Sequence, residues 1–161
     1  MAVFGDIQHA AVLIDQISLD GQRYQTETGL EADSLVLRLP AIDATGVTVP
    51  DRHDFIVYTV QQVQGRPLVL IRQLFVNRDV TGRLLTTGQR SVRVPETRPF
   101  VDEVLLPSQL ASIAPLFAFD RPVLAVAREV VLTVTFQATE SASTRRTFRQ
   151  TYAARFRLRN S

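Results

Sequence analysis

Residues 130–139 have the sequence VVLTVTFQAT, and this stretch decides the fold class of the chain. Its even positions are apolar from Val130 to Ala138, while threonine or glutamine occupies the odd positions from Thr133 onward. An alternation with a period of two is typical of a β-strand that buries one face and exposes the other. The stretch therefore predicts a long amphipathic strand.

The last part of the chain, residues 146–158, repeats this alternation in RTFRQTYAARFRL. Aromatic and small apolar residues hold most of its even positions, whereas arginine and threonine hold most of the odd ones. Two such strands joined across ESAST predict an antiparallel hairpin with one buried face. Because like faces must coincide, we place Phe136 opposite Phe148 and Glu129 opposite Arg155.

Shorter apolar runs predict further strands. Leucine alternates with other residues over positions 35–39, and Pro40 is expected to end that strand. Residues 54–63 and 67–76 are rich in β-branched and aromatic side chains, and a short glycine-containing turn separates them, so we expect a hairpin. Their nearly continuous apolar character predicts central strands that are covered on both faces.

Three turns are predicted from local sequence. Asp20-Gly21 follows a strand that is expected to begin at about Val12, and this dipeptide favours a tight turn. Residues 43–46 and 79–82 share the pattern Asp-x-Thr-Gly, which is typical of a type I turn with glycine at its last position.

The predicted architecture is all-β, an antiparallel β-sandwich or jelly-roll-like domain of about seven to nine strands with a C-terminal β-hairpin. Residues 107–114, PSQLASIA, fit at most one or two short helical turns because Pro115 ends the pattern. The length of 161 residues, with 45% hydrophobic and 21% charged residues, fits a single domain that spans residues 1–161.

Several kinds of chemistry are missing from the sequence. There is no cysteine, all 18 basic residues are arginine, and there are two histidines. Thiolate metal sites, a phosphate-binding P-loop lysine and a Schiff-base lysine are therefore excluded. The chain also lacks the G-x-S-x-G and G-x-G-x-x-G motifs. We expect a protein that is not an enzyme and has no catalytic residues, no cofactor and no metal site.

Two groups of polar residues are weak candidates for a site. Residues 51–54, Asp-Arg-His-Asp, place a histidine beside two carboxylates, as a metal site or an oriented base would require. Because strand alternation directs successive side chains apart, we favour a solvated loop after Pro50. A glycosidase or calcium site would need converging acids, and we favour solvated loops for these as well. The acidic residues concerned are Glu27, Glu31, Asp33, Asp102 and Glu103.

Charge is unevenly distributed along the chain. Residues 1–140 carry 12 arginines and all 16 acids, a net charge of −4, whereas residues 141–161 carry six arginines and no acid. The alternation separates these arginines from the aromatic residues, so buried rings cannot stack on nucleic-acid bases. The arginine row then faces water, a neighbouring subunit or phosphate, and the first two are favoured. The candidate interaction residues are Arg145, Arg146, Arg149, Arg155, Arg157 and Arg159.

No signal peptide is expected, because the first residues lack a basic segment, and no transmembrane segment, because the uncharged run of residues 104–119 is too short to span a bilayer. We expect a protein without a membrane partner, in the cytoplasm or assembled into a particle. The sequence predicts a structural or interaction module, a subunit of a virion, a tail or a similar assembly, with other protein subunits as partners in a homo- or hetero-oligomer. The alternative hypothesis is a β module that binds polyanions or nucleic acid through its arginines.

Overall fold

The computed structural model describes residues 12–26, 31–32, 34–61, 69–101, 104–105, 117–121, 127–139 and 147–158. Within these residues the fold is all-β and contains no helix, so the predicted class is confirmed. The described residues form twelve strands, more than the seven to nine expected, because several pieces such as β1, β4 and β9 have two residues each. The helical turns expected at residues 107–114 lie outside the described residues.

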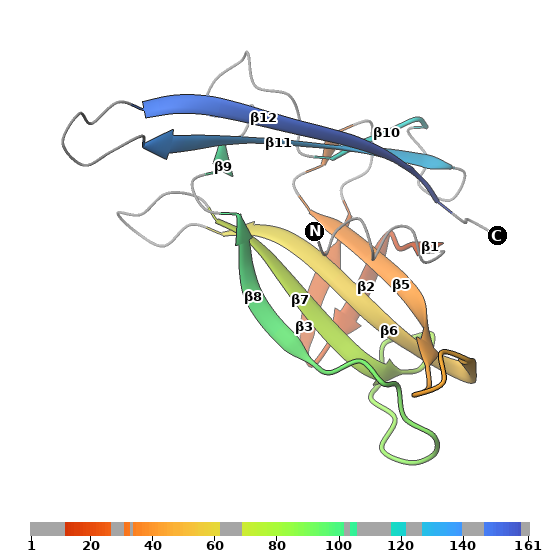
Figure 1. Cartoon of the computed structure of the whole chain (residues 1–161). Coiled ribbons are helices and arrows are strands. Elements are labelled where there is room, and N and C mark those ends of the chain that lie inside the picture. Colours follow the sequence, from red (N-terminus) through yellow and green to blue (C-terminus); the bar gives the residue numbers. More distant parts are fainter. Residues whose placement is uncertain are drawn as a thin grey trace.

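A five-stranded antiparallel sheet, the main sheet, forms the middle of the molecule (Figure 1). Its strands, in spatial order, are β1 (Val12–Leu13), β5 (Leu35–Ile42), β6 (Thr48–Gln61), β7 (Val69–Arg78) and β8 (Glu96–Val101). Strands β6 and β7 pair directly and occupy inner positions. The predicted central hairpin is therefore confirmed.

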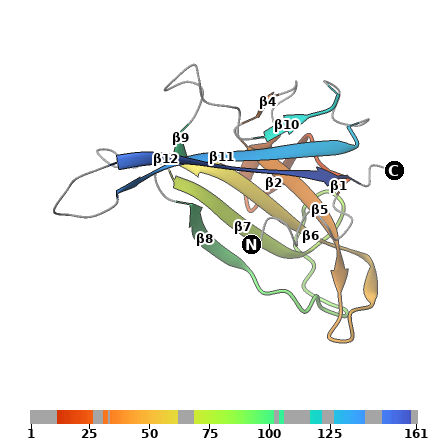
Figure 2. The ribbon, with the colours of Figure 1, turned by 45° about the horizontal axis from the view of Figure 1, so that its top comes forward.

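A second sheet, the C-terminal sheet, crosses over the main sheet (Figures 1 and 2). Its strands are β12 (Thr147–Arg157), β11 (Glu129–Thr139), β10 (Phe117–Phe119) and β4 (Glu31–Ala32), and β9 (Val104–Leu105) also pairs with β11. A separate hairpin consists of β2 (Gln16–Leu19) and β3 (Gln22–Gln25).

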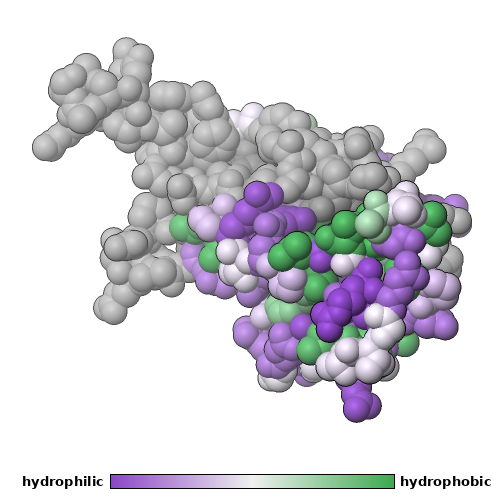
Figure 3. Space-filling view, turned by 60° about the horizontal axis from the view of Figure 1, so that its bottom comes forward, coloured by the Kyte–Doolittle hydropathy of each residue, from purple (hydrophilic) through white to green (hydrophobic). Residues whose placement is uncertain are grey.

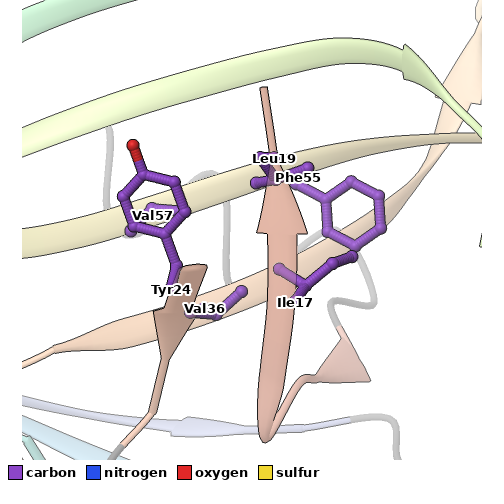
Figure 4. Packing of buried hydrophobic residues seen from close by; sticks show 6 residues of the cluster. All are labelled: Ile17, Leu19, Tyr24, Val36, Phe55 and Val57. Carbon is purple, nitrogen blue, oxygen red and sulfur yellow. The ribbon is translucent and has the colours of Figure 1, made fainter. Parts of the chain in front are cut away.

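The β2–β3 hairpin covers one face of the main sheet (Figure 4). Its apolar side chains and those of β5 and β6 form one cluster in which each residue is at most 9% exposed. The cluster consists of Ile17, Leu19, Tyr24, Val36, Phe55 and Val57. The ring of Tyr24 also lies 5.5 Å from the ring of Phe75 on β7, measured between centroids.

The C-terminal sheet covers the opposite face of the main sheet. On that face, Leu35 lies opposite Tyr58 and Leu37 lies opposite Ile56, and all four side chains are fully buried. The ring centroid of Tyr58 is 6.3 Å from that of Phe117 on β10, which joins the two sheets. The chain is thus a layered, sandwich-like structure in which the main sheet has a cover on each side.

The C-terminal hairpin forms as predicted, but its register differs by two residues. The structure pairs Phe136 with Gln150 and Glu129 with Arg157, whereas like-face matching placed these residues opposite Phe148 and Arg155. A two-residue shift keeps each position on the same face of the sheet, so burial cannot distinguish the two registers.

Pro40 does not end its strand, contrary to the prediction. Strand β5 continues to Ile42, and its register with β6 shifts between Pro40 and Ile42. Proline is tolerated within a sheet at such an irregularity, where the ladder is already interrupted.

Asp20 and Gly21 form the two-residue connection between β2 and β3. Both have positive φ, 53° and 80°, as a type I′ turn requires. The predicted tight turn is therefore confirmed, and its twist matches that of the two strands that it joins.

The two Asp-x-Thr-Gly turns have the same geometry. In the first, the carbonyl of Asp43 accepts a hydrogen bond from Gly46 N at 3.0 Å, and its Oδ1 accepts from Thr45 N and Oγ1 at 2.8 and 2.6 Å. In the second, the corresponding atoms of residues 79–82 make bonds of 3.0, 2.9 and 2.6 Å. The final glycines have φ of 85° and 94°. The predicted type I turns with a terminal glycine are thus confirmed.

The two turns differ in what surrounds the glycine, and this difference gives a test of how they are packed. A Cβ at Gly46 would meet nothing within 4 Å, whereas a Cβ at Gly82 would lie 2.6 Å from the carbonyl oxygen of Ser18 and 3.0 Å from Ile17 Cγ1. Gly46→Ala should destabilise the fold by roughly 1–2 kcal/mol through backbone strain alone. Gly82→Ala should cost about 1–3 kcal/mol more, because it also separates the turn from β2. Urea denaturation of both variants measures the difference, and equal losses would contradict the packing described.

Candidate interaction surface

The loops at one end of the main sheet are ordered by a buried carboxylate. Asp54 is completely buried in β6, and its Oδ2 accepts hydrogen bonds from Ser91 Oγ at 2.6 Å and from an Nη of Arg93 at 2.7 Å. Its Oδ1 accepts from the backbone N of Asn77 at 3.0 Å. The same Arg93 nitrogen donates to the carbonyl of Pro40 at 2.9 Å. The Asp54 carboxylate therefore connects β6 with β7 and with the segment that follows β7, and Arg93 extends this connection to β5.

Asn77 is the second centre of this network. It lies at an irregularity of the β6–β7 ladder, with a φ of 59°, in the left-handed region that asparagine tolerates better than most residues. Its Oδ1 accepts from Ser91 N at 2.7 Å and from Arg52 at 3.0 Å. Arg52, which is 5% exposed, also donates to the carbonyl of Thr87.

Residues 83–95 contain no regular strand, yet these bonds attach them to the sheet at several points. Leu85 N donates to the carbonyl of Asn77 at 2.8 Å, and Val92 N donates to the carbonyl of Ile42 at 2.7 Å. Gln89 reaches the carboxylate of Asp43 in the first Asp-x-Thr-Gly turn at 3.1 Å. The two turns and residues 83–95 therefore form one continuous group of loops.

These loops expose large apolar side chains to solvent. In the part of the chain whose burial is described, every large hydrophobic residue that is at least half exposed lies here, with exposures of 50% to 71%. They are Val47, Val80, Leu84, Val92 and Val94, and we call the surface that they form the loop-end surface. Figure 3, in which the lower side of Figure 1 comes forward, shows hydrophobic and strongly hydrophilic residues interspersed on this part of the molecule. Isolated apolar residues are common on protein surfaces, and these five differ in that all of them lie on ordered loops at one end of the main sheet.

The expected solvated loop at residues 51–54 is wrong. These residues belong to β6, and Arg52 and Asp54 are buried because they hold the loops that follow β7. Strand alternation, which we took as evidence against a metal site, places Arg52 and Asp54 on the same face of β6, and both side chains join the network. Among the described residues, no group of three or more histidine, aspartate or glutamate side chains could hold a metal ion. A buried Asp with a partner Asn more than 20 residues away leaves no local sequence signal.

His53 is partly buried beside this network. Burial lowers its pKa below the ordinary value of 6.5, and the charge of Arg38 acts in the same direction. The carboxylates of Asp51, Asp54 and Asp79 oppose this shift but do not cancel it. The folded protein therefore favours the neutral imidazole.

A hollow of about 340 Å³ lies beside the main sheet, next to the turn between β2 and β3. Its charged groups are already engaged, because Arg78 donates to both carboxylate oxygens of Asp20 at 2.6 and 3.1 Å. The hydrogen bond from Arg78 lowers the pKa of Asp20, and the guanidinium lies 5.6 Å from the ring centroid of Phe75. This arrangement fixes the β2–β3 hairpin to the end of β7 and does not resemble a site for a ligand.

The structure distributes the predicted interaction residues as follows. Arg149, Arg155 and Arg157 lie on β12 at positions that share one face of the C-terminal sheet. That face is opposite the one that carries Phe117, which packs on the main sheet. Arg145, Arg146 and Arg159 lie outside the described residues, as do Glu27, Asp33, Asp102 and Glu103 among the acids. Glu31 lies in β4.

No protein-family model, no curated protein and no solved structure matches the chain. Over the residues that the structure describes, no helix has the length and apolar character needed to cross a membrane.

Substitution at Asp54 tests whether the network holds the loops. Asp54→Asn replaces one buried acceptor by a donor that faces Ser91 and Arg93, so the free energy of unfolding should fall by roughly 2–4 kcal/mol. Asp51→Asn makes the same chemical change at an exposed position of the same strand, where asparagine tolerates the φ of 55°, and should change stability by less than about 0.5 kcal/mol. Chemical denaturation measures both values. If the two variants were equally stable, Asp54 would not be the centre of the network.

His53 predicts a specific pH dependence of stability. Because its folded-state pKa is lowered, the unfolded chain binds a proton more readily as the pH falls below 6.5. The stabilisation from the neutral imidazole is complete above pH 6.5 and decreases between that value and the lower folded-state pKa. The free energy of unfolding of the wild-type protein should therefore be lower at about pH 5.5 than at about pH 7.5, and His53→Gln should make this difference smaller. An unchanged difference, measured by urea denaturation at both values, would contradict the shift.

Proposed function

We propose that the protein is a non-enzymatic interaction module, a subunit of a larger protein assembly such as a virion, a tail or a similar multi-subunit particle. The observation that carries this proposal is that five large hydrophobic residues, Val47, Val80, Leu84, Val92 and Val94, are each at least half exposed on ordered loops at one end of the main sheet. Apolar side chains that are exposed on ordered loops are available for contact with a partner.

The order of the loops supports a binding role as well. Association costs free energy when flexible loops must be fixed in the complex. Here Asp54, Asn77 and Arg52 have fixed the loops already, so less of that cost remains when a partner binds. Burying an exposed valine or leucine completely contributes roughly 1.5–3 kcal/mol, so a few such side chains suffice for a specific contact.

The partners on this proposal are other protein subunits, in a homo- or hetero-oligomer. Exposed arginines, such as Arg83 and Arg90, lie among the apolar residues of the loops, and a polar rim around apolar contacts is typical of protein interfaces. The protein would be made in the cytoplasm and act there or in the assembled particle.

Binding of a polyanion or nucleic acid is the second candidate function. Its support is the register of β12, which gives Arg149, Arg155 and Arg157 one common face. Such a row can follow a phosphate backbone without sequence specificity, and its binding would weaken steeply with salt.

Paired aspartate substitutions test the assembly proposal. Val92→Asp combined with Val94→Asp places two charges on the loop-end surface and should weaken association at least about tenfold, because a charge without a partner is costly in an interface. Native mass spectrometry and analytical ultracentrifugation at micromolar concentration measure the oligomeric state and any co-purified subunit. Gln61→Asp combined with Thr97→Asp adds the same charges at exposed positions outside this surface and should leave association unchanged. A strictly monomeric wild-type chain that co-purifies with nothing would overturn the proposal.

A further inference from the structure

No described strand pairs with the outer edge of β12, which we call the open edge. Among the described strands β12 is the last one in the C-terminal sheet, and all eleven of its residues pair with β11 in one unbroken register (Figures 1 and 2). Proteins usually protect such an edge with charged side chains, proline, a bulge, a short strand or a covering loop. Strand β8, at the edge of the main sheet, has six residues, contains Pro99 and is paired with a register shift. Strand β12 has eleven residues with no proline and no bulge, and the protection that it carries is charge, from Arg149, Arg155 and Arg157.

The direction of the backbone groups of β12 follows from one hydrogen bond. Leu158 N donates to the carbonyl of Arg128 at 2.7 Å, in continuation of the β11–β12 register. In an antiparallel pair, successive residues direct their N–H and C=O groups alternately toward the partner strand and away from it. Even positions of β12 therefore bond to β11, and odd positions direct theirs to the open edge. These odd positions are Thr147, Arg149, Thr151, Ala153, Arg155 and Arg157.

The residues at the open edge also have a distinct charge. The residues whose N–H and C=O groups point to the open edge also occupy the face of the C-terminal sheet that is opposite the Phe117 face. Three of these residues are arginines. Thr151 and Ala153, between those arginines, are exposed. An added strand would pair with this backbone and place every second side chain beside the arginine positions. The remaining side chains of the added strand would extend the face of the C-terminal sheet that carries Phe117.

A second copy of the chain fits this edge poorly. If two copies of β12 paired antiparallel over their whole length, Arg149 of one copy would lie opposite Arg155 of the other, and the reverse. Like charges directly opposite each other on neighbouring strands are destabilising. A strand with carboxylates at alternate positions would instead make opposite-charge pairs.

We infer that the open edge of β12 binds an acidic strand from another protein by strand addition, a strand in which carboxylates alternate with apolar residues. This inference rests on the proposed function and names one class of partner for it. The apolar residues of the added strand extend the face toward the main sheet, and its carboxylates pair with Arg149, Arg155 and Arg157. A nucleic acid would use the arginines but would have no need of the outward N–H groups.

Synthetic peptides test the inference directly. The probe is a fluorescein-labelled peptide of eleven residues in which glutamate alternates with valine, and anisotropy measures its binding to the full chain. One control peptide has glutamine in place of glutamate, and another has the same composition with its glutamates in one block. A single-stranded oligonucleotide of similar length serves as the polyanion probe. The alternating peptide should bind at least about tenfold more tightly than either control peptide, because only it matches both the backbone and the charges.

Two kinds of variant separate backbone pairing from charge. Ala153→Pro removes one outward N–H and leaves the bonds to β11 intact, and Ala153→Thr is its matched control. Binding of the alternating peptide should weaken at least about tenfold in the proline variant and stay within about threefold in the threonine variant. The triple variant Arg149→Gln, Arg155→Gln, Arg157→Gln should also weaken binding and reduce its dependence on salt. Circular dichroism and urea midpoints check that each variant folds, and Thr151→Pro replaces Ala153→Pro if the latter does not.

The outcomes distinguish this inference from the proposed function. Peptide binding that is unaffected by either proline variant would overturn strand addition, as would equal binding of the blocked peptide. Preferential, proline-insensitive binding of the oligonucleotide would overturn it in favour of the polyanion hypothesis. If the chain assembles through Val92 and Val94 but does not bind the alternating peptide, this inference fails and the proposed function stands. A chain that binds the peptide but is strictly monomeric and co-purifies with nothing would support the edge site and overturn assembly through the loop-end surface.

Discussion

Strands β5 and β6 bury side chains on both of their faces, and this requires two covers. Val36 and Val57 need a layer on one side, while Leu35 and Tyr58 need a layer on the other. The chain supplies the first from residues that precede β5 and the second from residues far along the sequence. Without either layer a wide apolar surface would face water, so the sandwich-like arrangement follows from the composition of its two central strands.

The ends of a covered sheet cannot be closed by apolar packing in the same way, because strand ends leave backbone groups unpaired. In this protein, polar side chains close one end. Asp54 accepts hydrogen bonds from three donors, one on β7 and two in residues 83–95, and Asn77 accepts two more. A buried carboxylate is costly unless it is paired and fully hydrogen-bonded, and both conditions are met here. The loops are consequently part of the folded unit and can present side chains in fixed positions.

The sequence predicted what depends on local alternation and turn chemistry. The period of two over residues 130–139 predicted the long strand β11, and Asp20-Gly21 predicted the tight turn, because both signals lie within a few residues. The face of β11 that was expected to be exposed is not exposed throughout, since Thr135 on that face is 4% exposed. The sequence could not predict the register of β11 and β12, since a shift of two residues keeps every position on the same face of the sheet. The network around Asp54 was missed for a related reason. Its partners lie 23 to 39 positions away, and a polar run such as residues 51–54 resembles a loop until the partners are known.

Asn77 has a consequence for how relatives of this protein can be recognised. The position requires a residue that accepts a positive φ, offers an oxygen to Arg52 and Ser91, and adds no charge beside the carboxylate of Asp54. Glycine meets the first demand but has no side-chain oxygen, and aspartate would place a second negative charge in the same buried space. Asparagine meets all three. A distant homologue whose surface and core have diverged should therefore retain this aspartate and asparagine pair about one hairpin apart, followed by a serine, and these three positions form a fingerprint of the fold.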